Sequence, residues 1–411
     1  MIPKGWSSQK LSSVASIIDC KHRTPEYVKS GIPLVSPGTI KWGALDLISP
    51  VKRVTEEEYR SLMDHCVVEQ GDLVMSRNQS VGVVSYVDSK KPFVLGQDTV
   101  LIKAIHADWR FIYYTLQSDL VQRQIAKSAG GSTFSRINLS DIRALNIKTP
   151  AICEQDKISQ ILTAWDKAIS VTEKLLTNSQ QQKKALMQQL LTGKKRLLDE
   201  NGVRFSGEWE KGKFCDMANI DTGYAFKSKD FTQSDSGIPI IRMSDFKTGG
   251  LDVLGAAKVD RDSVNGLDKF KLRVGDFVFG MSGSLNNYGR VEKKDLPCYL
   301  NQRVGRILAK ECANQAFITY LYLSDSIQQS ILDKAAGAAQ LNISISDLRS
   351  MVVYYPCIEE QQKIAAVLSA ADAEISTLEK KLACLRDEKK ALMQQLLTGK
   401  RRVKVDEAVA E

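Results

Sequence analysis

The stretch KKALMQQLLTGK runs from Lys183 to Lys194 and recurs, letter for letter, from Lys389 to Lys400. The two copies lie 206 positions apart (389 − 183) in a chain of 411 residues. Self-similarity at a fixed offset is the signature of a repeated structural unit. The repeat therefore indicates that the chain holds two copies of one unit in tandem.

Further matches extend the repeat in both directions. At the same offset, Pro150-x-x-x-Glu154-Gln155 matches Pro356-x-x-x-Glu360-Gln361, Ser140-Asp141-x-Arg143 matches Ser346-Asp347-x-Arg349, and Gly31-Ile32-Pro33 matches Gly237-Ile238-Pro239. Gly71-Asp72 pairs with Gly275-Asp276 at 204, which implies small insertions. Residues 150–196 and 356–402 align without a gap, whereas the regions before them keep only scattered matches.

The gap-free segments have the periodicity of long helices. Apolar residues repeat in steps of 4 and 3 through 358–399, at Ile364, Leu368, Ala371, Ile375, Leu378, Leu382, Leu385, Leu392 and Leu396, with a skipped position at Lys389. The first copy keeps this register at Ile158, Leu162, Trp165, Ile169, Leu176, Leu186 and Leu190, interrupted at Thr172, Ser179 and Lys183. A seam sustained over about five heptads predicts a coiled coil.

A helix of about 40 residues is roughly 60 Å long and would expose its apolar stripe if it stood alone. The simplest partner is the other copy in the same chain, paired antiparallel, because the segment between the copies is long enough to span the rod. Pairing between two chains stays open.

The diverged regions carry short strand-like runs separated by glycine and polar turns, at 32–35, 73–75, 81–87, 99–102, 238–241 and 277–279. One helical segment follows in each copy, at 109–126 and 314–335. The predicted fold is α+β, a tandem duplication of a mixed α/β domain followed by a long helix, with the two helices paired as an antiparallel coiled coil. The predicted ranges are 1–149, 150–199, 200–355, 356–402 and a tail at 403–411.

Composition restricts the function classes. A net charge of +9 and a pI of about 9.0 favour a polyanionic partner such as nucleic acid. Eight cysteines form no C-x-x-C pair, and only three histidines exist, so neither a zinc site nor a disulfide framework is predicted. The sequence has no run of eighteen or more apolar residues and no signal-peptide h-region, so we expect a cytoplasmic protein.

Polar loops follow the two Gly-Asp pairs, in GDLVMSRNQSVGVVSYV and GDFVFGMSGSLNNYGRV. Arg can read guanine, Asn or Gln adenine, and Ser either base. The same place in both copies with different residues favours base reading over a solvated hairpin loop, which the composition alone would also fit. The candidate readers are Arg77, Asn78, Gln79, Ser80, Ser284, Asn286, Asn287, Tyr288 and Arg290.

Two further pairs of loops are candidates for nucleic-acid contact. The loops at 36–43 and 242–249 contribute Thr39, Lys41, Arg242, Ser244 and Lys247. The segments at 130–136 and 337–342 precede the repeat helices.

Motifs for catalysis are missing: the sequence has no G-x-G-x-x-G, P-loop, H-E-x-x-H, N-P-P-F or G-x-S-x-G. Glu154 opens a helix, where an acid suits the first turn, so a capping role is favoured over catalysis. We therefore expect no catalytic residue, cofactor site or metal site in this chain.

Two divergent domains, each followed by P-x-x-x-E-Q-x-K-I and a helix ending in L-M-Q-Q-L-L-T-G-K, resemble the specificity subunit of a type I restriction–modification system. The resemblance covers the whole chain. It implies that each target-recognition domain reads one half of an asymmetric, bipartite double-stranded DNA site. It also implies that the helices set the spacing and dock two adenine-methyltransferase subunits, which bring S-adenosylmethionine. Restriction subunits would add ATP- and Mg-dependent translocation.

The repeated dodecamer is predicted to meet one common partner twice, either the other helix or, in preference, a methyltransferase subunit. The predicted docking residues are Gln188, Gln189, Leu191, Gln394, Gln395 and Leu397. Two alternatives remain from the sequence, the recognition subunit of a related type II-like restriction–methylation system and a DNA-binding regulator without an enzymatic partner. Two matched docking helices argue against a regulator, and the large loop-bearing domains argue against a coiled-coil adaptor.

Overall fold

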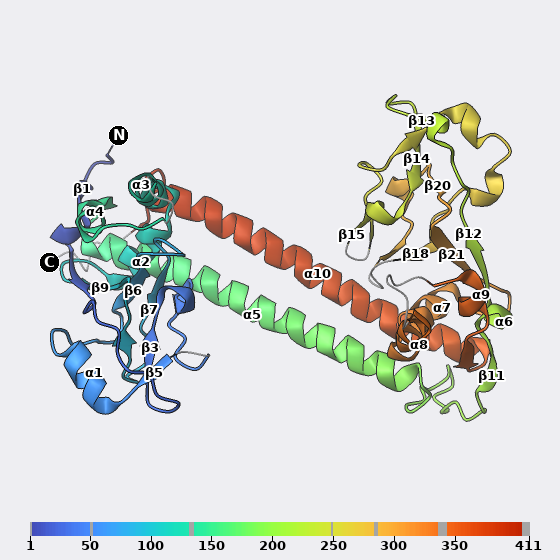
Figure 1. Ribbon diagram of the computed structural model, residues 1–411, viewed down its shortest axis with the longest axis horizontal. Coiled ribbons are helices and arrows are strands. Elements are labelled where there is room, and N and C mark those ends of the chain that lie inside the picture. Colours follow the sequence, from blue (N-terminus) through green and yellow to red (C-terminus); the bar gives the residue numbers. More distant parts are fainter. Residues whose placement is uncertain are drawn as a thin grey trace. The chain divides into compact units, whose positions relative to one another are not determined.

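The computed structural model describes residues 2–49, 52–130, 135–247, 250–282, 287–335 and 343–404 (Figure 1). It divides into two compact units. Unit 1 comprises Met1–Glu173 and Lys380–Glu411, and unit 2 comprises Lys174–Glu379. The units cut across the linear ranges predicted from the sequence, because each of the two long helices contributes one part to each unit.

The long helices are α5 (Ile152–Leu190) and α10 (Ile358–Leu396), each of 39 residues. Both begin two residues after a proline and end shortly before Gly193 or Gly399, whose positive φ of 69° or 70° glycine adopts without strain. The predicted helices are therefore confirmed.

The helices pair antiparallel within one chain. In unit 1, Glu173 bonds Arg386 at 2.6 Å and Asp166 bonds Lys389 at 2.5 Å, so the residue numbers run in opposite directions. In unit 2, Ser179 and Lys183 of α5 contact Glu374 and Asp372 of α10. These contacts confirm the predicted antiparallel pairing and place it inside a single chain.

Unit 1 holds a five-stranded sheet in the order β2-β9-β6-β7-β4, with bounds Ala15–Asp19, Thr99–Ala104, Leu73–Ser76, Val84–Tyr86 and Gly43–Ala44. A second sheet has the order β5-β3-β8, with bounds Lys52–Val54, Ile32–Val35 and Val94–Leu95. The start and end of the domain are joined by β1 (Ser7–Lys10) and β10 (Asn146–Thr149), which pair antiparallel.

Unit 2 repeats this plan. Its first sheet has the order β12-β21-β18-β19, with bounds Ala218–Thr222, Val304–Ala309, Phe277–Gly280 and Tyr288–Arg290. Its second has the order β13-β17-β14-β20, with bounds Phe231–Thr232, Lys258–Val259, Ile238–Ile241 and Tyr299–Leu300. A small hairpin joins β15 (Phe246–Lys247) to β16 (Gly250–Leu251), and β11 (Glu210–Lys213) pairs with β22 (Val352–Tyr355).

The helical segment predicted in each domain is wrong in one respect, because each is two helices. Residues 109–126 form α2 (Trp109–Gln117) and the start of α3 (Asp119–Ala129). Ser118 between them is extended, and its hydroxyl accepts a hydrogen bond from the Val121 amide, so it caps α3. Unit 2 has the same break between α7 (Gln315–Tyr322) and α8 (Asp325–Ala335). The remaining α-helices are α1 (Glu56–Met63), α4 (Leu139–Ala144), α6 (Phe214–Met217) and α9 (Ile345–Arg349).

Both ends of the apolar seam are buried in the domain cores. Ile158 and Leu162 of α5 join the core of unit 1 together with Leu396 and Leu397, from the end of α10 and the residue after it. The matching set from the opposite helix ends joins the core of unit 2, namely Ile364, Leu368, Leu190 and Leu191. Each domain core is therefore completed by the end of the other repeat's helix. No helix among the described residues is long and apolar enough to cross a membrane.

Candidate nucleic-acid and partner interface

Two of the candidate reading loops lie together in unit 1. The loop after β6 carries Gln79 and Ser80, which are exposed, and Gln79 has a positive φ of 59°. A Cβ added at Gly38, in the preceding loop, would lie 3.4 Å from Oε1 of Gln79. Thr39 and Lys41 belong to that neighbouring loop. The structure therefore brings Thr39, Lys41, Gln79 and Ser80 together at the end of the five-stranded sheet where β4 and β7 begin.

Arg77 lies in the same loop but is only 5% exposed. Its guanidinium donates to Oδ1 of Asp19 at 2.7 Å and to the carbonyl oxygen of Ile137 at 3.2 Å. The Arg77 side chain is therefore held inside the protein, and its removal would leave the Asp19 carboxylate without its cation. Asn78 is turned inward as well, since it donates to Asp98 at 3.4 Å and accepts from the Gln79 amide.

The equivalent loops of unit 2 also lie together. A Cβ at Gly280 would lie 2.6 Å from Met243 and 3.0 Å from Asn287, so the loop that carries Arg242, Ser244 and Lys247 borders the loop after β18. Ser244 is exposed, and Lys247 is 68% exposed although it pairs with Asp252. The candidates Ser284 and Asn286 lie outside the described residues, as do most of the segments at 130–136 and 337–342.

Tyr288 and Arg290 are placed differently from the other candidates. They line a cavity of about 230 Å³ with Lys183, Thr319 and Asp372, beside the long helices rather than at the loop. The position of Thr319 is taken in unit 1 by the buried Tyr113, which stacks edge-on against Tyr86. The threonine at this position in unit 2 is smaller than the tyrosine and leaves more space beside the long helices.

The repeated dodecamer contacts the recognition domain that belongs to the other repeat. Gln394 donates to Asp119 at 3.0 Å at the start of α3, and Gln188 donates to Asp325 at 2.8 Å at the start of α8. Leu191 and Leu397 are buried in the two cores. All four glutamines among the predicted docking residues are exposed, and the side chains of Gln189 and Gln395 make no hydrogen bond to the described part of the chain. The two copies of the dodecamer therefore make equivalent contacts within the chain, since Asp119 and Asp325 take the same place in the two domains.

The interruptions of the apolar seam at Lys183 and Lys389 form a polar site that sequence reasoning missed. Lys389 bonds Asp166, whose second oxygen accepts the Tyr114 hydroxyl at 2.7 Å. Lys183 bonds Asp372, which accepts the Tyr320 hydroxyl at 2.6 Å. Burial, together with the nearby carboxylate, raises the pKa of both tyrosines above its ordinary value. Each hydroxyl therefore stays protonated and donates a hydrogen bond to the aspartate. The 206-residue spacing of both lysines and both aspartates was the available signal.

Glu154 lies in the first turn of α5, as expected, and its hydrogen bonds give it a structural role. Its carboxylate is buried and receives two hydrogen bonds from Arg402, at 2.6 and 2.8 Å, and one from Nε1 of Trp6 at 3.2 Å. Glu360 is bound in the same bidentate way by Arg196, at 2.7 Å for both bonds. The glutamine after each glutamate links two segments. Gln155 donates to the carbonyl oxygen of Pro150 and accepts from the backbone amide of Asp108, just before α2. Gln361 makes the same bonds with Pro356 and with Asn314, just before α7.

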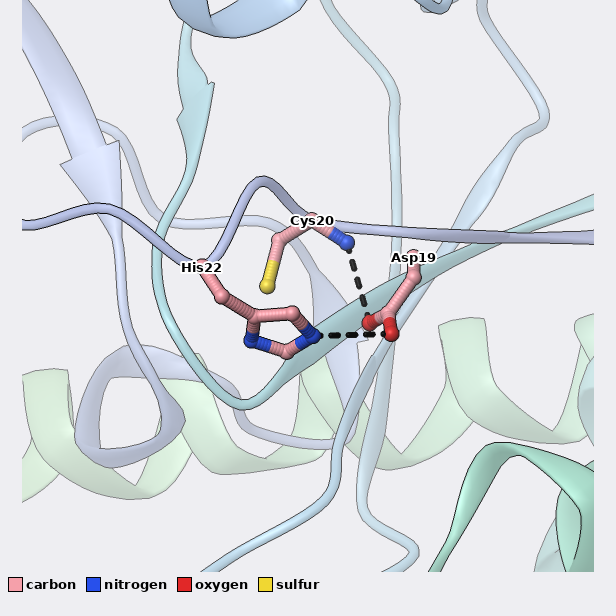
Figure 2. Close-up of side chains that lie close together, drawn as sticks. All are labelled: Asp19, Cys20 and His22. Carbon is pink, nitrogen blue, oxygen red and sulfur yellow. Dashed lines mark hydrogen bonds and ion pairs between the residues drawn. The ribbon is translucent and has the colours of Figure 1, made fainter.

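Figure 2 shows three side chains of the types that can bind a metal ion, Asp19, Cys20 and His22, which lie close together. His22 contacts Asp19 at 3.1 Å, while Arg77 occupies the other carboxylate oxygen. Burial raises the pKa of the Cys20 thiol, which disfavours the thiolate that a metal requires. The chemistry of this donor set therefore fits a hydrogen-bonded anchor for Arg77 better than a metal centre.

Comparison with known proteins agrees with this architecture. The model of the type I restriction modification DNA specificity domain matches residues 3–178 and again 206–385. Over 98% of its length the chain is 24% identical to a putative type I restriction enzyme specificity subunit, MjaX, of Methanocaldococcus jannaschii, of which it covers 95%. It is 23% identical to the EcoKI specificity subunit of Escherichia coli K12, with 93% of this chain and 85% of that one covered.

A crystal structure has the same fold. The S subunit of a type I restriction–modification system from M. genitalium superposes with a TM-score of 0.60 at 16% identity, over 97% of this chain and 99% of that one. The matched family is one of DNA specificity domains. With both halves matched by the family model, the chain belongs to the type I restriction–modification DNA specificity family.

Proposed function

We propose that this chain is the DNA-sequence-specificity subunit of a type I restriction–modification complex and that each recognition domain reads one half of an asymmetric, bipartite site. One observation carries the proposal. The two units share their anchoring contacts to the long helices, yet they differ in the side chains of the loops at the same sheet edge. Shared anchors with different loops suit a protein that presents two different readers in the same way.

The exposed loop residues have the chemistry for this task. Gln79 can bond an adenine edge in the major groove, and Ser80 and Asn287 offer further donors and acceptors. Lys41 and Lys247 are suited to phosphate contacts, which fix the position of a protein on DNA without selecting a sequence. The net charge of +9 supports the same polyanionic partner.

The catalytic work falls to partners in this proposal. Two adenine-methyltransferase subunits bind S-adenosylmethionine, and restriction subunits bind ATP and Mg. The chain itself holds no cofactor and acts in the cytoplasm.

Gln79→Ala is expected to reduce discrimination at one base position by about tenfold or more, because a bidentate contact to a base edge is lost. Arg77→Ala is the informative contrast. It leaves Asp19 without its cation and is expected to lower the stability of unit 1, with no selective change at one base. Binding of randomised DNA sites by the assembled complex, read by sequencing, separates the two results. An unchanged preference in Gln79→Ala would remove this loop from the reading surface.

Co-purification tests the assembly. The full chain, co-expressed with the adenine methyltransferase from the same source, is expected to recover two methyltransferase subunits per chain. A stable chain that binds none would contradict the proposal.

Gln189→Glu together with Gln395→Glu is expected to weaken methyltransferase binding, since both side chains are exposed on the dodecamer and a change there disturbs no side-chain hydrogen bond among the described residues. Either single change is expected to leave a complex with one subunit, which native mass spectrometry can count. Gln188 and Gln394 are unsuitable for this test because glutamates there would repel Asp325 and Asp119. Full occupancy in the double variant would place the docking surface elsewhere.

A further inference from the structure

Both recognition domains carry a second short repeat. Leu45-Asp46-Leu47-Ile48 in unit 1 matches Leu251-Asp252-Val253-Leu254 in unit 2, again at an offset of 206 (254 − 48). The first tetrad directly follows β4, and the second begins at the last residue of β16. The repeat therefore lies in the diverged part of the chain, on equivalent loops of the two domains.

The aspartate holds each loop in shape. The Asp46 carboxylate accepts hydrogen bonds from the backbone amides of Ile48 and Ser49, at 2.8 and 3.0 Å, and from the Ser49 hydroxyl. The Asp252 carboxylate accepts one from the Gly255 amide at 3.3 Å and pairs with Lys247 at 2.8 Å. Such carboxylate-to-backbone bonds are typical of tight polar turns.

The last residue of each tetrad projects into solvent. Ile48 is 83% exposed and Leu254 is 98% exposed. The residues before them behave in the opposite way, since Leu45 is buried and Leu47, Leu251 and Val253 pack against the cores of their domains. In each turn, the neighbouring apolar residues pack against the domain core, and one aliphatic side chain is exposed to solvent.

An exposed aliphatic side chain adds almost nothing to the stability of the chain that carries it, because the hydrophobic free energy follows the area removed from water. Single exposed aliphatics are common and need no function. Val67 is an example, 74% exposed, with Lys271 at the matching position of the other copy, where the local offset is 204. Ile48 and Leu254 differ, because position, exposure and anchoring aspartate all recur.

We propose that Ile48 and Leu254 are contact points that each insert into an apolar pocket on a protein that the complex holds in two identical copies. Within the function proposed above, on which this inference rests, that protein is the methyltransferase subunit. The tetrad would then be a second site of contact for each copy, on the recognition domain rather than on the long helices.

In unit 1 the surroundings of the tip favour a protein over DNA. In unit 1 the exposed candidates Lys41 and Gln79 lie at the end of the sheet where the parallel strands β4 and β7 begin, whereas Ile48 lies beyond the end of β4. The hydrogen bonds from Ser49, chiefly from its hydroxyl, lower the pKa of Asp46 to about 2, so a charged carboxylate lies beside the aliphatic tip. A carboxylate repels phosphate, while it is compatible with the polar rim of a protein interface.

The double variant Ile48→Ser, Leu254→Ser tests this contact. Both side chains are solvated, so the fold is expected to stay intact, which circular dichroism and thermal melting verify. The full chain is titrated with the purified methyltransferase subunit, and binding is measured by calorimetry. We expect the double variant to weaken binding at both sites by about tenfold or more, from the loss of one buried aliphatic side chain at each. Each single variant should weaken one site. Val67→Ser is the matched control and is expected to bind as the unchanged chain does.

The outcomes are distinguishable. Failure of the unchanged chain to bind any methyltransferase would refute the proposed function itself. Normal methyltransferase binding by the double variant would overturn the inference alone. Normal methyltransferase binding together with weaker DNA binding by the assembled complex would also overturn it and would assign the tips to DNA, where aliphatic wedges between base steps are known.

Discussion

A chain that ends at Glu379 is expected to lose the folded structure of unit 1 while unit 2 stays folded, although the deleted residues lie at the far end of the sequence from the first domain. The deletion removes Leu396 and Leu397 from the core that contains Trp6 and Leu11. It also removes Arg402 and leaves the buried Glu154 without its cation. Truncation of one buried leucine to alanine costs about 2–5 kcal/mol, and a domain has only about 5–15 kcal/mol in total.

Hydrogen exchange read by mass spectrometry can localise this loss. Peptides from 7–149 should exchange at the rate of an unfolded chain, while peptides from 210–355 keep their protection. A chain that ends at Lys404 retains all the described contacts and is the control. Protection of the first domain in the shorter chain would show that the long-helix end is not part of its core.

Arg196→Ala is expected to destabilise unit 2 by about 3–5 kcal/mol, because it leaves a buried carboxylate without compensation. Glu360 is 0% exposed and takes both of its hydrogen bonds from Arg196. Urea unfolding, followed by hydrogen exchange and mass spectrometry of peptides from each unit, gives the free energy of unfolding of each unit with all tryptophans in place.

Two variants sharpen this test. Arg402→Ala should cost less in unit 1, because the Arg402 side chain is 47% exposed and Trp6 still donates to Glu154. Replacing both Arg196 and Glu360 by methionine should restore much of the lost stability, since no charge is then left buried. Equal losses in Arg196→Ala and Arg402→Ala would contradict the burial argument.

The parts of the fold that depend on local periodicity could be predicted from the sequence. The seam predicted both long helices, and runs such as 32–35 and 238–241 coincide with β3 and β14. The break at Ser118 was missed because a serine within an amphipathic pattern does not by itself end a helix. The strands β1 and β11 were missed because each is short and polar and is held only by a partner about 140 residues away.

The candidate site was harder to predict because exposure decides it. Arg77 and Gln79 are two residues apart in one polar loop, and nothing in their spacing separates them. Asp19, 58 residues earlier, draws Arg77 into the protein and leaves Gln79 outside. The lysines that interrupt the seam could have been assigned from the repeat, since their aspartate partners lie at the same offset.

The two units differ in how their residues are ordered along the chain. Unit 2 is one continuous segment, whereas unit 1 needs both ends of the chain. In unit 1 the ion pair between Arg402 and Glu154 joins residues 248 positions apart, whereas the equivalent pair in unit 2, Arg196 and Glu360, joins residues 164 positions apart. During synthesis, unit 2 can therefore reach its final structure before Leu396, Leu397 and Arg402, which complete unit 1, have left the ribosome. The domain that is translated first is thus completed after the second one.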